Sequence, residues 1–292
     1  MDIISIHKYL VILLIGKSGM MYRPLLLLWL SIFTNVDAAE TFILARAPQL
    51  SPSVTSKEWT PFVKYLSEKT SSNIILKVYS HRTDFEQDIQ EGKVDIYYGN
   101  PGYGVVGHLK HGYLPIIRSD QKELKGIVVA RKDSGISDIK QLHGQTIAFP
   151  SSSSFAASLY LRSILKTDFG IDFNTEYLGT HDNVYRSILV GKSTAGGGVY
   201  RTLNREDKRV REQLQIIYET PGMKPHPLMI SKNIGQTMRK KIQQAILELN
   251  TTNEGKELLK TIKIQKPVKA DYQRDYKSIE ALVLNMYDYL LK

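Results

Sequence analysis

The stretch GIVVA at residues 126–130 separates an inner block of the chain from the parts on either side of it. A short run of small and β-branched apolar residues predicts a buried strand. Two more strands are predicted at 214–218 and 228–230, on either side of the Pro-rich segment 220–227. These separated points bracket residues 126–224, so we predict a second lobe that is inserted into the first and joined to it by two connections.

Short apolar runs alternate with amphipathic stretches along the chain, which is the pattern of an α/β protein. We assign residues 39–125 and 225–292 to the first lobe and 126–224 to the second. A hinge made of two connections would place a ligand site in the cleft between the lobes. The strands predicted in the first part of the chain are 41–45, 74–78 and 94–98.

Helix ends are marked by capping residues. Thr60 followed by Pro61 predicts a helix start, because Thr is a good N-cap and Pro suits the first helical position. Gly92 and Gly112 follow predicted helices and predict their ends. After residue 230 only helices are predicted, and the last of them covers 272–291.

The composition restricts the chemistry that the chain can perform. It has 292 residues, no cysteine, 39 Lys and Arg, 29 Asp and Glu, and a formal net charge of +10. Without cysteine there is no disulfide, no Cys-type metal site, no thiol nucleophile and no lipid-modified cysteine anchor. The excess of basic residues predicts an anionic partner, which could be nucleic acid, a membrane surface or a small anion.

The first residues have the order of a secretory signal. A basic start at 20–23 precedes an apolar core at 25–33, and a small residue, Ala38, follows. We predict a signal peptide over 1–38 that is cleaved after Ala38, with Met20 or Met21 as alternative starts. Neither apolar run of this region reaches the ~20 residues of a bilayer span. An uncleaved signal anchor is the alternative. After cleavage a net charge of +9 remains.

Four serines, residues 151–154, stand where a predicted strand passes into a predicted helix. The first N–H groups of a helix have no intrahelical partner and carry partial positive charge. Hydroxyl donors beside them would complete a seat for a phosphate-like anion. We predict that Ser152, Ser153 and Ser154 form this seat. The alternative is an ordinary serine N-cap in a polar loop.

Three other strand ends supply further candidate ligand-binding residues. His181 follows a predicted strand at 176–178 and could donate to an oxyanion. Tyr98 and Asn100 lie at the end of the strand 94–98, where Tyr97 and Tyr98 point to opposite faces, so that one of the two can pack in the core while the other offers its hydroxyl to the cleft. Tyr200 follows three glycines that allow close backbone approach. For each residue, a structural role without a ligand is the alternative.

Several other functions are disfavoured by the sequence. The sequence contains no HExxH or H-x3-H motif that would predict a metal site. It also contains no recognisable nucleophile–base pair that would predict a catalytic site. We therefore expect no metal and no cofactor. The basic segments 205–211 and 239–241 have the pattern of exposed helix faces. Without a sustained basic stripe and stacking aromatic residues, nucleic-acid binding is not expected.

Taken in chain order, five segments resemble one known family: the substrate-binding proteins of phosphate, phosphite and phosphonate ABC importers, of PhnD type. These segments are WTPF at 59–62, GKVDIYYGNP at 92–101, GIVVARKD at 126–133, IAFPSSSSFAA at 147–157 and GTHDNVYRSILVG at 179–191. The resemblance implies a type 2 periplasmic-binding-protein fold, in which two α/β lobes joined by two crossing hinge segments enclose the ligand. It also implies that the serine run and His181 contact the phosphorus oxyanion and that Tyr98 faces the cleft.

One segment departs from the family. Its members usually carry Val-Asp where this chain has Ser193-Thr194, and an acid there would suit a ligand amine. Its absence favours a small oxyanion or a phosphonate without an amine. We therefore expect a monomeric, non-enzymatic periplasmic protein that delivers a phosphorus oxyanion to an ABC permease at the inner membrane. The alternatives are a ligand-sensing subunit of a membrane sensor kinase or receptor and, less favoured, an enzyme acting on a phosphorylated small molecule.

Overall fold

The computed structural model describes residues 39–121 and 123–286. The chain divides into two compact units, residues 1–39 and 40–292, and the helices and strands described below belong to the second. The predicted signal peptide over 1–38 lies outside the described residues. Within the described residues, no helix has both the length and the apolar character that a membrane span requires.

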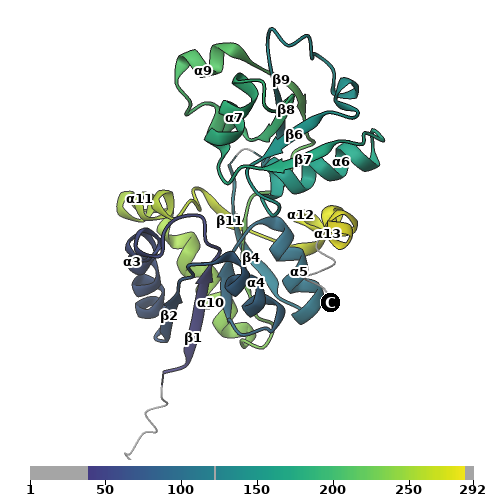
Figure 1. Cartoon of the computed structure of the whole chain (residues 1–292). Helices are drawn as coiled ribbons and strands as arrows, with labels where there is room; N and C mark the ends of the chain where they lie inside the picture. Colours follow the sequence, from purple (N-terminus) through teal and green to yellow (C-terminus); the bar gives the residue numbers. More distant parts are fainter. Residues whose placement is uncertain (1–38, 122, 287–292) are drawn as a thin grey trace, which may run out of the picture. The chain divides into compact units, whose positions relative to one another are not determined.

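The second unit contains two separate sheets, which confirms the predicted α/β class with two lobes (Figure 1). The first sheet has the strand order β11-β4-β10-β3-β1-β2. Its strands are β1 (Thr41–Arg46), β2 (Asn73–Lys77), β3 (Ile96–Tyr98), β4 (Leu114–Ser119), β10 (Pro227–Ile230) and β11 (Pro267–Lys269). The helices of this lobe are α3 (Pro52–Thr70), α4 (Arg82–Gln90), α5 (Pro101–His111), α10 (Gln236–Leu249), α11 (Asn253–Thr261), α12 (Tyr272–Asp275), the 3-10 helix η3 (Lys277–Ile279) and α13 (Glu280–Met286).

Alternation along the strands of the first sheet gives it two apolar faces. Tyr97 and Met229 pack with α4, α5, α12 and α13 on one face, and Tyr98 and Leu228 pack with α3, α10 and α11 on the other. Figure 1 shows α3 and α10 together and α4 beside α5. Successive residues of a strand point to opposite faces, so each face receives its own cluster of side chains. The predicted opposition of Tyr97 and Tyr98 is therefore confirmed.

The second sheet has the strand order β7-β6-β8-β5-β9. Its strands are β5 (Ile127–Arg131), β6 (Thr146–Phe149), β7 (Asn174–Tyr177), β8 (Ala195–Gly198) and β9 (Leu214–Glu219). The helices of this lobe are the 3-10 helix η1 (Ile139–Leu142), the π-helix η2 (Phe155–Tyr160), α6 (Leu161–Thr167), α7 (His181–Leu189), α8 (Tyr200–Leu203) and α9 (Lys208–Gln213). One face packs against α6 and the other against α7.

Two connections link the sheets, from β4 to β5 and from β9 to β10, as the insertion pattern predicts. They are paired with each other: the amides of Leu124 and Met223 each donate to the other's carbonyl, at 2.8 and 3.0 Å. At the start of β5, the Gly126 amide donates to the Thr220 hydroxyl at 2.9 Å. A Cβ at Gly126 would clash with the backbone carbonyl of Ala156, so the end of this connection packs directly on η2. The residue boundaries of the two lobes stay a prediction.

The predicted start of the first helix is wrong. Helix α3 begins at Pro52 with Ser51 as its N-cap, and Pro61 lies inside it. Thr55 and Trp59, which precede Pro61, are buried on the same side as Phe62, so the helix gains apolar contact by extending backwards. Pro61 costs one backbone hydrogen bond, at an exposed position where water can solvate the freed carbonyl.

The prediction that only helices follow residue 230 is also wrong. The short strand β11 pairs antiparallel with β4, and α12, η3 and α13 replace the single helix predicted at 272–291. Three residues are too few to show strand alternation in the sequence. By contrast, the helix ends at Gly92 and Gly112 are confirmed, since both glycines adopt positive φ angles, of 65° and 68°.

The three glycines predicted to allow close approach form the strand β8. A Cβ at Gly197 would clash with the Ala157 carbonyl and lie 2.6 Å from the Phe149 ring, and one at Gly196 would lie 2.9 Å from Ile188. Helices η2 and α7 therefore pack directly on the backbone of β8, so the close approach that these glycines allow is that of two helices.

We predict that Gly197→Ala lowers the free energy of unfolding by about 1–3 kcal/mol, because both neighbours of the new methyl group belong to the core. Chemical denaturation measures the effect. Gly235→Ser is the matched control, since a Cβ there meets nothing within 4 Å and serine is a good N-cap. Equal stability of the two variants would contradict this account of β8.

Candidate functional site

The carboxyl ends of three parallel strands define one edge of the second sheet. Strands β7, β6 and β8 are neighbours, and β6 is parallel to both of the others. Polar segments follow their ends: Ser152–Ser154 follows β6, His181 follows β7 and Tyr200 follows β8. The Leu178 amide donates to the Phe149 carbonyl at 2.9 Å, so the first two strand ends are directly linked. Ligands of open α/β sheets bind outside such ends, so the topology brings these predicted site residues to one edge.

The serine hydroxyls at this edge are not used by the protein itself. Ser154 is the N-cap of η2, yet its side chain makes no capping hydrogen bond. Among the residues that the structure describes, the hydroxyls of Ser152, Ser153 and Ser154 have no hydrogen-bond partner, although Ser153 is buried. The ordinary N-cap that was the alternative role for Ser154 is therefore not observed.

The helix that follows the serines begins with a π turn. The Ser154 carbonyl accepts from the amides of Ser158 and Leu159, at 2.9 and 3.0 Å. Hydrogen bonds of the π type skip one residue more than those of an α-helix, so one additional amide at the start lacks an intrahelical acceptor. The helix continues as α6, and its N-terminal amides lie beside the serine hydroxyls. This combination suits an anion.

His181 is held in place by a chain of hydroxyl groups. Its Nδ1 lies 3.2 Å from the Thr202 hydroxyl, which lies 2.8 Å from the Tyr185 hydroxyl. The Thr202 hydroxyl has a single proton and also donates to the Val199 carbonyl at 2.9 Å. While it does so, Nδ1 is the donor to Thr202. If Thr202 turns its proton to Nδ1 instead, the ring proton lies on Nε2, where it can be donated to a ligand. Burial lowers the pKa of His181 to about 4, helped by the positive charge of Arg205. The ring is therefore neutral at pH 7.

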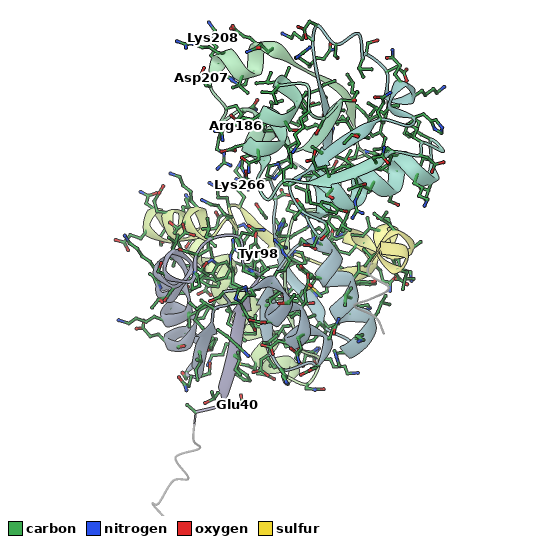
Figure 2. The ribbon with its side chains drawn as sticks, viewed as in Figure 1. Glu40, Tyr98, Arg186, Asp207, Lys208 and Lys266 are labelled. Atoms are coloured by element: carbon green, nitrogen blue, oxygen red, sulfur yellow. The ribbon has the colours of Figure 1, made fainter. Side chains whose placement is uncertain are left out.

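Tyr98 and Asn100 lie at the corresponding edge of the first sheet, where β1 and β3 end (Figure 2). The Tyr98 ring is buried against Trp59, with ring centroids 5.3 Å apart, and its hydroxyl donates to the Lys263 carbonyl at 3.1 Å. The Asn100 side chain caps α5 by accepting from the Tyr103 amide at 3.0 Å. Both residues therefore have structural partners, and a ligand role for either stays a prediction.

Tyr200 begins the short helix α8 and is 41% exposed. Glu219, the last residue of β9, accepts a hydrogen bond from the Tyr200 phenol and raises its pKa. The Tyr200 hydroxyl therefore already has a carboxylate partner in the protein. Its predicted contact with a ligand stays a prediction.

The edge of the first sheet carries two residues that the sequence reading did not select, Arg46 and His226. Arg46 is the last residue of β1 and lies in register with Tyr98. The His226 ring lies 5.8 Å from the Tyr98 ring and directly precedes β10. Burial, together with the positive charges of Arg46 and Arg201, lowers the pKa of His226 to about 4. The available signal was an arginine that ends the otherwise apolar run TFILA.

Comparison with known proteins identifies the family. The profile of "ABC transporter, phosphonate, periplasmic substrate-binding protein" matches residues 44–276, so this chain belongs to that family. The family consists of substrate-binding transport proteins and not of enzymes. Its members are periplasmic proteins that bind small phosphonates and work with an ABC transporter.

Solved structures with the same fold include members of this class. PhnD1 from Prochlorococcus marinus, in complex with methylphosphonate, has a TM-score of 0.69 at 17% identity, over 85% of this chain and 98% of that one. XAC2383 from Xanthomonas citri, bound to chloride ion, has a TM-score of 0.75 at 15% identity, over 85% and 99%. A binding protein component of an ABC phosphonate transporter from Pseudomonas aeruginosa has a TM-score of 0.67 at 15% identity, over 85% and 87%. At these identities the likeness shows the fold, which is that of type 2 periplasmic binding proteins.

We predict that the protein loses stability as the pH falls from about 6.5 towards 4. His181 and His226 have folded-state pKa values of about 4, below the ~6.5 of an unfolded histidine, so the unfolded state binds more protons in this range. Their contribution is present above pH 6.5 and is lost as the pH falls. Each half-buried ring should contribute about 1–2 kcal/mol to the change.

Urea denaturation of the His181→Gln variant between pH 4 and pH 8 measures this effect. The variant should show a flatter stability profile than the wild type, because glutamine does not titrate. His81→Gln, at an exposed position, controls for the loss of an imidazole as such. A His181→Gln profile as steep as that of the wild type would refute the assigned pKa direction.

Proposed function

We propose that this protein captures a phosphorus oxyanion, which is a phosphonate, phosphite or phosphate, between its two lobes and delivers it to an ABC importer. Membership of the phosphonate-binding family supports the class of ligand. The observation that carries the proposal is the set of serine hydroxyls without partners at the start of η2, on the sheet edge that also carries His181.

In the proposed complex, Ser152, Ser153 and Ser154 donate hydroxyl protons to the phosphorus oxyanion, together with the first amides of η2. A charge-assisted hydrogen bond of this kind is about twice as strong as a neutral one. His181 adds the proton of Nε2, and its fixed Nδ1 contact orients the ring before the ligand arrives. These groups are neutral, so the seat does not depend on a protein cation that must be desolvated.

The remaining predicted residues complete the enclosure. Tyr98 and Asn100 contribute the surface at the end of β3, and Tyr200 contributes a hydroxyl from α8. Closing the lobes on the ligand would exclude water and strengthen the hydrogen bonds to it. We also propose that the mature protein starts after Ala38, acts in the periplasm as a monomer and passes the ligand to a permease of the inner membrane.

A thermal-shift panel of phosphate, phosphite, methylphosphonate, 2-aminoethylphosphonate and sulfate tests the ligand class. A bound ligand at a hundred times its dissociation constant stabilises the folded state by about 2.7 kcal/mol, which is readily measured. We expect stabilisation by at least one phosphorus anion and less by sulfate. The absence of any shift with millimolar phosphorus anions would contradict the proposal.

The variant Ser153→Asp should abolish binding of the phosphorus anion, because it places a carboxylate against the ligand. Isothermal titration calorimetry with the best ligand of the panel measures the loss. Ser137→Asp introduces the same charge at an exposed position of the same lobe and should bind like the wild type. Retained affinity in Ser153→Asp would show that the seat lies elsewhere.

The variant His181→Ala should weaken binding by about tenfold to a hundredfold, which is the range for one hydrogen bond to a charged group. His181→Gln, which keeps an N–H donor, should recover part of the loss. If both variants bind as tightly as the wild type, His181 is not a ligand residue.

A further inference from the structure

The guanidinium of Arg46 is buried at the ligand-facing edge of the first sheet. Arg46 is 5% exposed and ends β1, in register with Tyr98 at the end of β3. These two strands are parallel, so their carboxyl ends form the edge outside which an α/β sheet binds ligands. A buried cation at this place needs an explanation, because an unpaired charge is costly to remove from water.

The hydrogen bonds of Arg46 leave part of its guanidinium unused. One terminal nitrogen donates to the Ala47 carbonyl, and the other donates to Oε1 of Gln49 at 3.1 Å. The Nε atom is buried and has no hydrogen-bond partner among the described residues. Glu58 is near enough to favour the charged form of the Arg46 guanidinium. Within the described part of the chain, however, no carboxylate forms an ion pair with Arg46.

The buried Arg118 shows how the same lobe neutralises an arginine when the charge is structural. Its Nε, like that of Arg46, is buried without a hydrogen bond, but its guanidinium forms ion pairs with Asp275 at 3.4 Å and Asp120 at 3.2 Å. The Arg118 side chain is 12% exposed, so the two arginines are buried to a similar extent. Arg118 has two carboxylate partners from the protein, whereas Arg46 has none among the described residues.

The charged neighbours of Arg46 are Glu58 and the two cations Arg201 and Arg82, and Gln49 is a neutral neighbour. Gln49 connects Arg46 to His226, since its Nε2 lies 3.4 Å from Nε2 of that ring. Burial lowers the pKa of Arg46, and Arg201 and Arg82 add to this, against the opposing effects of Tyr98 and Glu58. An anion placed at this edge would relieve the repulsion among these cations.

We infer that Arg46 binds a second anionic group of the ligand, a carboxylate, and that the substrates of this protein are phosphonates that carry a carboxylate. This inference rests on the proposed function, in which the serines of the other lobe hold the phosphonate group. The guanidinium fork matches a carboxylate in a bidentate geometry, which a neutral or cationic ligand group cannot use.

A ligand amine is the competing possibility, and the structure contains a place for it. Burial raises the pKa of Glu206, and a hydrogen bond with Asp182 raises it further, although Arg186 and Arg205 act in the opposite direction. Glu206 therefore has two nearby guanidinium groups of the protein, whereas Arg46 has no ion pair with a carboxylate among the described residues.

Isothermal titration at pH 8 with three ligands of similar length tests the inference. They are 3-phosphonopropionate, propylphosphonate and 2-aminoethylphosphonate. We expect the wild type to bind 3-phosphonopropionate about tenfold to a hundredfold more tightly than propylphosphonate, in line with a charge-assisted hydrogen bond. This ratio is measured on the unaltered protein and does not depend on any variant folding.

The variant Arg46→Gln should reduce the ratio to about one while binding propylphosphonate nearly as the wild type does. Arg46→Lys keeps the charge, loses the fork and should give an intermediate ratio. Arg209→Gln removes one positive charge from an exposed helix face and is the matched control. A change in the ratio for this control would overturn the assignment to Arg46 and attribute the preference to net charge.

The outcomes separate this inference from the proposed function. If propylphosphonate binds and 3-phosphonopropionate binds no more tightly, the carboxylate site is wrong and the phosphorus seat stands. If 2-aminoethylphosphonate binds most tightly, Asp182 and Glu206 determine specificity and the inference is overturned. If no phosphonate binds to the folded protein, the proposed function itself fails.

Discussion

The arrangement of the second lobe depends on the parallel pairing of β7, β6 and β8. Because these strands run in one direction, the serine run, His181 and Tyr200 all emerge at the same edge. Helices η2 and α7 pack closely on β8 because its glycines carry no side chains that would hold them away. The turns that carry the candidate site are therefore positioned by strand pairing and by helix packing in the core of the lobe.

The two sheet edges offer different kinds of donor. The second lobe provides hydroxyl groups, helix amides and a neutral imidazole, which have little desolvation penalty when a ligand covers them. The first lobe provides a guanidinium with an unused Nε and a neutral histidine linked to it through Gln49. A ligand that touches both lobes is recognised by hydrogen-bond geometry on one side and by charge on the other. Such a division allows selectivity to change on one lobe without disturbing the other.

The sequence predicted the two α/β lobes, and it placed the serine run and His181 at strand ends, because each of these features depends on a local pattern of strand, polar turn and helix. The binding of an anion by the serines stays a prediction. The sequence did not reveal Arg46, whose importance comes from its pairing with Tyr98, 52 residues later in the chain, and from the lack of a protein carboxylate beside it. The start of α3 was missed for a related reason. The burial of Thr55 and Trp59 against other elements outweighed the strong local signal of Thr60-Pro61. Long-range packing decided these features, and a single sequence does not display it.

The contact between Gly126 and the Ala156 carbonyl joins a connection between the two sheets to the turn that follows the serines. Gly126 stands where a connection between the sheets enters β5, and Ala156 lies in the first turn after the serines. With no side chain between them, the two backbones are in direct contact. A displacement of the serine-bearing turn cannot be absorbed by a rotamer change at this point. Such a displacement would instead have to move the backbone of Gly126 and with it the crossing segments, which are hydrogen-bonded to each other at Leu124 and Met223.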